Sequence, residues 1–303
     1  MRDPHQPPLG SLLLLTVGVA GVSLSGPLMA AAATVPALAM SLWRSALGAL
    51  VILPFSVRTS TPGLRALPRQ VVVRSCFAGL MLAVHFAAWT TALKYTSVAS
   101  ATALVCLQAA WVVVLSFLAG EGVVPRVWLG LGFAFAGVLV VSGVDFTVSV
   151  KALTGDMLAL VGGMFSAVYT VIGGRVRPML ETSTYALLCY GTSALVLLVA
   201  CVVGRVEMWE FGLRGWLLIV AVTVAAQLLG HTVFNHLLAT LSPTLVSMTV
   251  LLEVPGAALL AAVFLGQAPP TAVYAGLGLI CAGLAIVVRS GSPAATPGAL
   301  AVD

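Results

Sequence analysis

Charged residues are scarce in this chain of 303 residues: Asp, Glu, Lys and Arg make up 8%, while hydrophobic residues make up 60%. The mean hydropathy is +1.13. A soluble globular domain carries roughly 25% charged residues, so this composition excludes one and predicts an integral membrane protein. The net charge of +5 falls mostly on short connections, and we expect no nucleic-acid partner.

Several motifs that would indicate other kinds of protein are also missing. The five cysteines fall inside apolar runs without paired spacing, which argues against a disulfide framework or a zinc site. No Gly-x-x-x-x-Gly-Lys-[Ser/Thr] loop occurs, so no nucleotide motor is expected. The runs also lack paired aspartates and a His-Glu-x-x-His motif. We therefore expect no cofactor, no bound metal and no intramembrane enzyme.

What the chain does contain is ten apolar runs of roughly 20 residues, long enough to cross about 30 Å of hydrocarbon as helices. The sequence therefore predicts an all-α integral membrane protein with ten transmembrane helices. The runs are approximately Ser11 to Ala33, Ala37 to Phe55, Val71 to Leu93, Val98 to Ala119, Val127 to Gly143, Thr154 to Gly174, Ser183 to Gly204, Gly215 to Leu238, Ser242 to Leu265 and Thr271 to Val288.

The two halves of the chain are similar to each other. Residues 85–137 align without a gap with residues 231–283, at an offset of 146 positions. Internal repeats of this kind indicate a duplicated architecture. Each copy has five runs, an odd number, so the second copy must enter the membrane from the opposite side. The matched positions include His85 with His231, Gly120 with Gly266, Gly130 with Gly276, Gly132 with Gly278, and Gly137 with Gly283.

The distribution of basic residues predicts that both termini are cytoplasmic, because cytoplasmic loops carry an excess of Lys and Arg. We expect two inverted five-helix repeats at 11–146 and 153–289, between cytoplasmic tails at 1–10 and 290–303. Nine arginines then lie on or near the cytoplasmic side and four basic residues lie opposite. The nine are Arg2, Arg58, Arg65, Arg69, Arg74, Arg126, Arg175, Arg177 and Arg289; the four are Lys94, Lys151, Arg205 and Arg214.

Glu253 is the clearest ionisable residue within an apolar run, about twelve residues into the ninth. Intramembrane acids are costly and often mark a pathway for substrate or protons. Pro255 follows two residues later, where it would favour a kink and leave the carbonyl of Leu251 without its helical partner. We interpret Glu253 as a coupling residue that alternates between charged and neutral forms, with a structural carboxyl as the alternative.

Arg44 lies in the second run, where the other repeat has Tyr190. It could bind a substrate carboxylate, pair with Glu253, or extend towards the membrane surface.

Polar side chains also mark the third and eighth runs. In the eighth, three of them recur every four residues and so lie on one helical face. We expect the polar and aromatic residues of this face and of its counterpart to line a shared substrate cavity, with a histidine bonded to a neighbouring carbonyl as the alternative. Gln108 and Tyr169 are weaker candidates for the same cavity. The two faces are Gln227, His231 and Asn235, and Met81, His85 and Trp89.

The glycines predict structure more than chemistry. Gly132 and Ala136, like Gly278 and Ala282, form small-x-x-x-small pairs, which let helices pack closely within the chain or in a homodimer. Pro27 in the first run and the Gly162-Gly163 pair in the sixth are expected to interrupt matching spans. Interruptions in matching helices indicate the binding or moving region of a transporter.

Several tracts resemble the EamA-type family of the drug/metabolite transporter superfamily. The resemblance covers nearly the whole chain and implies a ten-helix carrier whose central cavity opens alternately to either side, often an exporter of amino acids or other small metabolites. The tracts are Ala92-Leu93-Lys94-Tyr95-Thr96-Ser97, Gly120-Glu121, Gly155-Asp156-Met157-Leu158-Ala159-Leu160, Leu252-Glu253-Val254-Pro255 and Gly266-Gln267.

The resemblance has departures. Glu253, Pro255 and Glu121 match residues usual in the family, but Gln267 stands where a second closing glutamate is common, and Ala109 where the first repeat often has proline. A role for a symmetric glutamate pair is therefore not expected.

Our leading hypothesis is a secondary transporter in the cytoplasmic membrane, in contact with lipid and a small-molecule substrate, with protons as a further partner at Glu253. Amino acids are the favoured substrates, and nucleobases or drug-like compounds are the alternative. A non-transporting scaffold or receptor is the alternative of another class.

Overall fold

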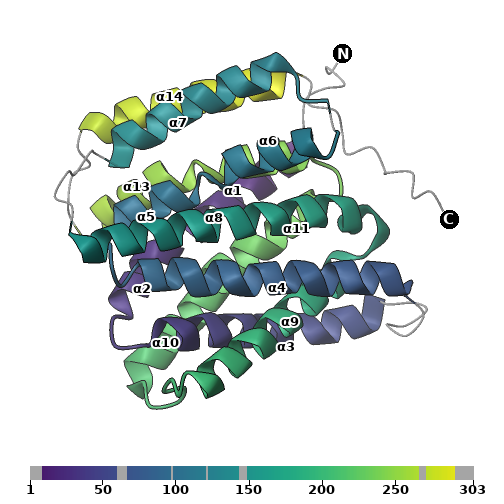
Figure 1. Cartoon of the computed structure of the whole chain (residues 1–303), viewed down its shortest axis with the longest axis vertical. Helices are drawn as coiled ribbons and strands as arrows, with labels where there is room; N and C mark the ends of the chain where they lie inside the picture. Colours follow the sequence, from purple (N-terminus) through teal and green to yellow (C-terminus); the bar gives the residue numbers. More distant parts are fainter. Residues whose placement is uncertain are drawn as a thin grey trace.

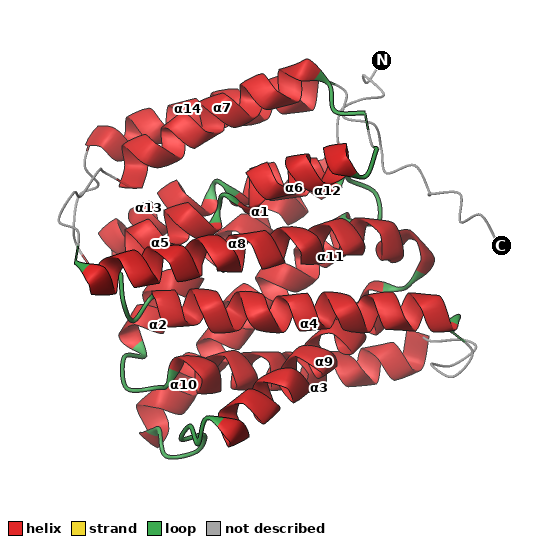
Figure 2. Cartoon of the chain, viewed as in Figure 1, coloured by secondary structure: helices red, strands yellow, loops and turns green. Residues whose placement is uncertain are grey.

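The computed structural model of the chain describes residues 9–59, 67–96, 98–120, 122–142, 149–265 and 271–290, and all regular elements in them are helices (Figure 2). The helices run roughly side by side and are stacked along the longest axis of the molecule (Figure 1). Their bounds are α1 Leu9–Ser23, α2 Ser25–Ala31, α3 Ala37–Thr59, α4 Arg69–Ala92, α5 Val98–Val105, α6 Gln108–Leu118, α7 Pro125–Ser142, α8 Val150–Val176, η2 Arg177–Met179, α9 Thr182–Val203, α10 Gly212–Val222, η3 Thr223–Thr232, α11 Val233–Leu237, α12 Pro243–Val250, α13 Glu253–Leu265 and α14 Thr271–Arg289.

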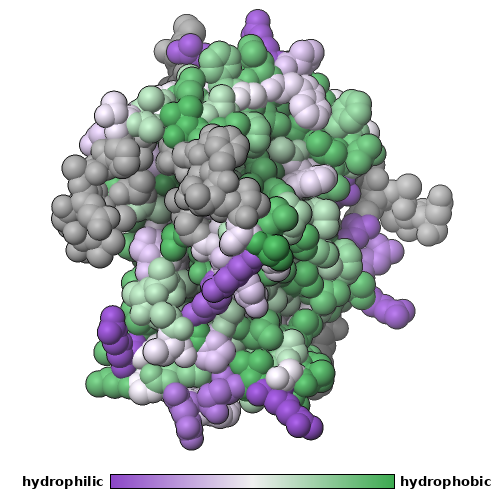
Figure 3. Space-filling view, turned by 60° about the vertical axis from the view of Figure 1, so that its left-hand side comes forward, coloured by the Kyte–Doolittle hydropathy of each residue, from purple (hydrophilic) through white to green (hydrophobic). Residues whose placement is uncertain are grey.

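Length and composition identify membrane-crossing candidates among these helices. Within the described residues, seven helical stretches are long and apolar enough to span a membrane, and three shorter apolar helices accompany them. The face of the molecule in Figure 3 carries many apolar side chains, and hydrophilic ones are scattered among them and at its ends. The expectation of an all-helical membrane protein is confirmed for the described residues. Glu121, Gly266 and Gln267, which carried part of the family resemblance, lie outside them.

Proline and serine set several helix starts. The first residue of α7 is Pro125 and that of α12 is Pro243. Proline suits this position because its missing N–H would have no intrahelical partner there. Ser149 caps α8 by accepting from the backbone N–H of Ala152 at 3.0 Å, and Ser242 caps α12 by accepting from Leu245 at 3.2 Å. Such side-chain caps satisfy donors left free at a helix start.

The first and ninth apolar runs are each broken into two helices. The first is divided at Leu24, between α1 and α2, and the ninth at Leu251 and Leu252, between α12 and α13. In both cases a proline is the third residue of the helix that follows, Pro27 in α2 and Pro255 in α13. A proline there costs no intrahelical bond, because the first N–H groups of a helix have no partner in it.

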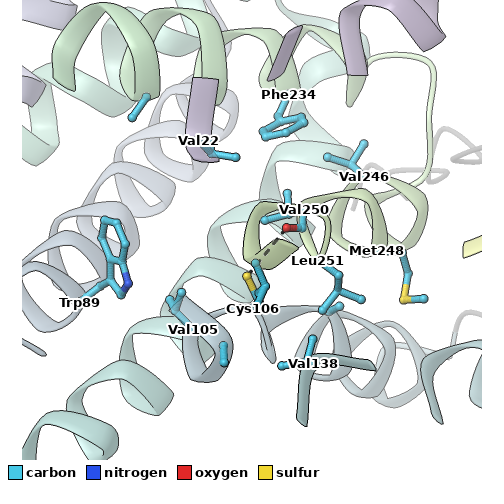
Figure 4. Packing of buried hydrophobic residues seen from close by; sticks show 14 of the residues in the cluster. Val22, Trp89, Val105, Cys106, Val138, Phe234, Val246, Met248, Val250 and Leu251 are labelled. Carbon is cyan, nitrogen blue, oxygen red and sulfur yellow. Dashed lines mark hydrogen bonds between the residues drawn. The ribbon is translucent and has the colours of Figure 1, made fainter. Parts of the chain in front are cut away.

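The break beside Glu253 differs from its prediction in one respect. The carbonyl of Leu251 is not left free, because it accepts from the backbone N–H of Val254 at 3.3 Å. The freed carbonyl is that of Val250, which accepts a weak bond from the thiol of Cys106 at 3.8 Å (Figure 4).

The fourth run is broken too, and this break lacks a proline. It falls at Cys106 and Leu107, between α5 and α6. Under the offset of the repeat, this is the equivalent of the break between α12 and α13. Tight bonds from Leu107 N to Leu104 O and from Ala109 N to Cys106 O, both 3.2 Å, replace the α-helical pattern.

The sixth run, by contrast, is uninterrupted, so the prediction that runs one and six carry matching interruptions is wrong. Gly162 and Gly163 lie inside the continuous helix α8. Gly163 serves close packing instead: a Cβ at this position would lie 2.7 Å from the carbonyl oxygen of Val105, at the end of α5. The matching interruptions are in the fourth and ninth runs.

The eighth run departs from α-helical geometry. Residues Thr223–Thr232 form a π-helix, η3, between α10 and α11. The carbonyl of Gln227 accepts from the hydroxyl of Thr232 at 3.0 Å, and the hydroxyl of Tyr190 lies 3.4 Å from the same carbonyl. The helix α1 crosses this segment closely, since a Cβ at Gly21 would lie 2.5 Å from the carbonyl oxygen of Ala225.

The helices pair across the two halves of the chain. At one end of the long axis α3 packs against α9, and at the other α7 packs against α14 (Figure 1). Between them, α4 packs along α8 while α1 packs along η3. The broken helices α5, α6, α12 and α13 lie between α8 and the α7–α14 pair.

Glycines bring α7 and α14 into backbone contact. A Cβ at Gly130 would lie 2.7 Å from the carbonyl oxygen of Gly283, and one at Gly137 would lie 2.6 Å from that of Gly276. A Cβ at Gly132 or Gly278 would meet no described atom within 4 Å, so these two positions do not bring α7 and α14 together, and their role in a homodimer stays a prediction. The contacting glycines are seven residues apart, about two turns, and so lie on one face.

Candidate functional site

A central cavity lies among the helices of both halves, with an empty volume of about 650 Å³ that includes space open to solvent. Figure 4 shows part of its apolar lining, where Val22, Trp89, Val105, Phe234 and Val250 surround the same space. The polar lining consists of Ser25, Arg44, His85, Gln108, Ser166, Tyr169, Thr170, His231, Asn235, Ser247 and Glu253.

The structure brings almost all the predicted site residues to this one cavity. They come from α3, α4, α6, α8, η3, α11 and α13. Gln227 lies behind the wall and contacts the cavity residue Arg44 instead. The lining residues that were predicted are Arg44, His85, Trp89, Gln108, Tyr169, His231, Asn235 and Glu253.

Arg44 supplies an incompletely paired cation. Its side chain is 1% exposed. Its Nε donates to Oε1 of Gln227 at 3.0 Å, and its guanidinium carbon lies 3.9 Å from the centre of the Phe86 ring. The nitrogens Nη1 and Nη2 have no hydrogen-bond partner among the described residues, so they do not pair with Glu253. Unpaired buried donors are costly, and a bound anion would satisfy these two.

Glu253 supplies the cavity's carboxylate. It is 7% exposed and is the first residue of α13, directly after the break in the ninth run. A carboxylate is favoured at a helix start, where backbone N–H groups are unsatisfied. The break therefore brings a helix N-terminus and an acidic side chain to the same wall of the cavity, while Pro255 lies two residues further along α13.

The two histidines that match in the repeat lie next to each other on the cavity wall, edge to face. The rings of His85 and His231 have centroids 6.2 Å apart. Nδ1 of His85 lies 2.9 Å from the carbonyl oxygen of Gly162. A carbonyl can only accept, so this ring nitrogen carries the proton. The bonding of His85 to a carbonyl, which the sequence left as an alternative, thus coexists with a place on the cavity wall.

A hydrogen-bonded chain joins three helices beside the cavity. The hydroxyl of Tyr169 donates to Oδ1 of Asn235 at 2.6 Å, and Nδ2 of Asn235 donates to the hydroxyl of Tyr190 at 3.4 Å. Arg177 adds a bond from its Nε to the backbone carbonyl of Asn235 at 2.8 Å. The network fixes α8, α9 and α11 relative to one another.

Sequence reasoning missed several polar residues of the lining. Ser166 donates to Oε1 of Gln108, and the hydroxyl of Thr170 bonds to the carbonyl of Ser166 at 2.9 Å. The signal was available, because Ser166, Tyr169 and Thr170 are spaced i, i+3 and i+4 and so share a helical face. Ser25 and Ser247 have other hydroxyl residues close by in their runs, and no spacing distinguishes them from these neighbours.

The indole of Trp89 is a further unpaired donor on the wall. Its Nε1 is buried and has no hydrogen-bond partner among the described residues. The ring stacks parallel to that of His85, at 6.3 Å between centroids. The cavity therefore combines aromatic surface with a cation, a carboxylate and free N–H donors.

Comparison with protein families adds the decisive observation. The model of the EamA-like transporter family matches residues 9–143 and again residues 153–289. The chain belongs to the EamA-like transporter family. Membership points to a transporter rather than an enzyme, and together with the apolar helices it indicates a multi-pass membrane protein.

Individual relatives extend this comparison. An uncharacterized transporter of Archaeoglobus fulgidus is 37% identical over 87 residues, which are 28% of this chain and 30% of that protein. The match thus spans less than a third of the relative's length. A protein of known crystal structure aligns with 93% of this EamA-like chain and 97% of its own, with a TM-score of 0.76 and 20% identity. At that identity the likeness concerns the fold alone.

Proposed function

We propose that this protein is a secondary transporter that carries small zwitterionic metabolites, such as amino acids, across the cytoplasmic membrane by alternating access. The observation that carries the proposal is that one cavity holds both a guanidinium group and a carboxyl group. Arg44 offers two NH2 groups without a partner among the described residues, and Glu253 offers a carboxylate. An amino acid presents the complementary carboxylate and ammonium groups, and guanidinium binds carboxylates with two parallel bonds.

The proposed architecture is ten spans in two inverted repeats with both termini in the cytoplasm. Three observations support it. The family model matches two separate segments of similar length. The broken helices α5–α6 and α12–α13 fall at equivalent positions. Gly130 contacts Gly283 while Gly137 contacts Gly276, an antiparallel and reciprocal pattern expected of helices related by a pseudo-twofold axis.

Alternating access would use the two repeats as its moving parts. Carriers built from inverted repeats bind substrate at the interface between repeats, beside discontinuous helices. The cavity has this setting, since it is lined from both halves and by residues next to both matching breaks, including Val105, Gln108, Val250 and Glu253. The direction of transport follows the gradients, and export is the direction we propose for a metabolite that accumulates in the cell.

The test is uptake of labelled amino acids and nucleobases into proteoliposomes that contain wild type or Glu253→Gln, with and without an imposed pH gradient. We expect amino acid uptake by the wild type that the gradient accelerates, and loss of this acceleration in Glu253→Gln. Glu210→Gln, at an exposed position between α9 and α10, is the matched control and should behave like wild type.

Other outcomes would redirect the proposal. Gradient-insensitive uptake that Glu253→Gln retains would leave a facilitator and make Glu253 structural. Uptake of nucleobases but not amino acids would favour the alternative substrate class. A well-folded protein that carries neither would favour a scaffold or receptor.

A further inference from the structure

Gln227 is buried behind the cavity wall, with 0% of its surface exposed. Its Oε1 accepts from Nε of Arg44 at 3.0 Å. An arginine Nε can only donate, so the amide must turn its oxygen towards Arg44. We propose that Gln227 is a positioning residue, which holds the Arg44 guanidinium so that Nη1 and Nη2 together meet a substrate carboxylate end-on. This inference rests on the proposed function of the cavity.

The guanidinium is held on two sides. Its face lies on the Phe86 ring, 3.9 Å from the centroid, and its Nε is occupied by Gln227. A carboxylate can bind arginine side-on, through Nε and one terminal nitrogen, or end-on, through both terminal nitrogens. Gln227 excludes the first arrangement and leaves the second. Since the planar fork of arginine matches carboxylate geometry, fixing its direction also fixes where the carboxylate sits.

Close packing keeps Gln227 in place. A Cβ at Gly48 would lie 2.8 Å from Cγ of Gln227. Gly48 lies four residues after Arg44 on α3, and its missing side chain leaves room for Gln227 beside Arg44. The remaining donor, Nε2 of Gln227, is buried and has no partner among the described residues. Leaving such a donor unpaired costs stability. The cost is expected if Oε1 of Gln227 is required beside Nε of Arg44.

Gln227 and His231 lie four residues apart in the π-helix η3 but have different surroundings. Gln227 contacts Arg44, while His231 is part of the cavity lining. The segment η3 thus provides both the residue that holds Arg44 and a residue of the cavity wall.

The test uses Gln227→Met, which has similar length but no hydrogen-bonding oxygen, and Gln227→Glu, which keeps an oxygen but adds a charge that neutralises Arg44. Arg44→Lys and the double variant complete a cycle, because lysine has no Nε–H to be held. Leu228→Met is the matched control one residue along η3. Probes are L-leucine and L-phenylalanine, with 3-methylbutylamine and 2-phenylethylamine as analogues that lack the carboxylate.

Two readouts are measured: ligand-induced thermal shifts of purified protein, and KM and Vmax of uptake into proteoliposomes. We expect Gln227→Met to raise Kd and KM for the amino acids roughly tenfold, the size of effect that losing one hydrogen bond to a charged group produces. Vmax and binding of the amines should change little. Gln227→Glu should fold as well as wild type yet lose amino acid affinity, and Gln227→Met should have no further effect in the Arg44→Lys background.

The two readouts separate this inference from the proposed function. Amino acid binding that is weakened by Gln227→Met, without any transport, would support the inference and overturn the transporter. Transport in which Gln227→Met has wild-type KM, or lowers only Vmax, or adds its effect to that of Arg44→Lys, would overturn the inference and leave the transporter. Absence of amino acid binding and transport in the wild type would overturn both.

Discussion

The α7–α14 pair and the central cavity both bring together residues from the two halves of the repeat, but they differ in how alike those residues are. In the pair, two glycines of one half pack reciprocally against their two counterparts in the other, Gly130 against Gly283 and Gly137 against Gly276. In the cavity, the equivalent residues His85 and His231 lie next to each other, but the neighbours on either side differ. Trp89 in one half corresponds to Asn235 in the other.

The difference shows where the duplicated sequence is free to diverge. Helix packing within a membrane depends on van der Waals contact and close approach, so both halves must keep small residues where the pair touches. The cavity instead leaves donors unpaired, at Arg44 and Trp89. Such donors lower stability and are expected at sites that bind something else. The pair should therefore respond to mutation through stability, and the cavity through transport.

The largest effect is expected for Gly130→Val. The new side chain would begin 2.7 Å from the carbonyl oxygen of Gly283 and the Cγ2 of Val287, so α7 and α14 would have to separate. Overpacking of this kind costs about 1–3 kcal/mol or more. We expect a marked fall in the melting temperature of the purified protein, measured by thermal unfolding in detergent.

Gly132→Val is the matched control on the same helix. A Cβ at Gly132 meets no described atom within 4 Å, and the residue is exposed, so the change should stay within about 0.5 kcal/mol. Equal destabilisation by the two substitutions would show that α7 and α14 do not pack as described.

The fold was predictable to the extent that hydropathy determines it. Each of the ten apolar runs is helical in the described residues, because a backbone in hydrocarbon must satisfy its own hydrogen bonds. The breaks were harder to predict. Pro27 and Pro255 indicated two of them, but the break at Cys106 has no proline. It lies where Gly163 of α8 packs closely against Val105, a contact between distant segments that the sequence does not show. The pair Gly162-Gly163 looked like an interruption, although a glycine in a helix also permits close contact.

The site was predictable because polar residues are conspicuous in an apolar chain. Eight of the nine residues predicted for binding or coupling line the cavity. The exception is Gln227, which lies beside the site but does not line the cavity. The sequence assigned it to the face of His231 and Asn235 by α-helical spacing. Gln227 contacts Arg44 on α3 and Tyr190 on α9, and periodicity within one run does not reveal such contacts with other helices.

An intermediate effect is expected for Gly163→Ala, because Gly163, like the glycines of the α7–α14 pair, permits close contact with the backbone of another helix. In Gly163→Ala the added methyl would lie 2.7 Å from the carbonyl oxygen of Val105, at the break between α5 and α6. This oxygen belongs to the backbone and cannot rotate aside as a side chain can, so we expect α8 and α5 to move apart. We expect a loss of about 1–2 kcal/mol and a lower Vmax in proteoliposome uptake.

The adjacent Gly162→Ala separates this contact from the general effect of removing a glycine. Its Cβ would meet neighbours at 3.4 Å, an ordinary contact, and alanine favours a helix interior by roughly 0.5–1 kcal/mol. Its melting temperature should equal or exceed that of wild type. If Gly163→Ala were equally harmless, the break at Cys106 would not depend on contact with α8.

The smallest effect on stability is expected for Trp89→Phe, because its Nε1 has no partner to lose. If that donor serves the substrate, KM should rise roughly two- to tenfold, the value of one neutral hydrogen bond, at nearly constant melting temperature. Trp216→Phe is the opposite case, since its Nε1 donates to the carbonyl of Trp209 at 3.3 Å outside the cavity: it should lower the melting temperature slightly and leave KM unchanged. A Trp89→Phe variant with wild-type KM would mean that the unpaired indole is a cost of packing, and would weaken the contrast between a cavity built for a ligand and a pair built for stability.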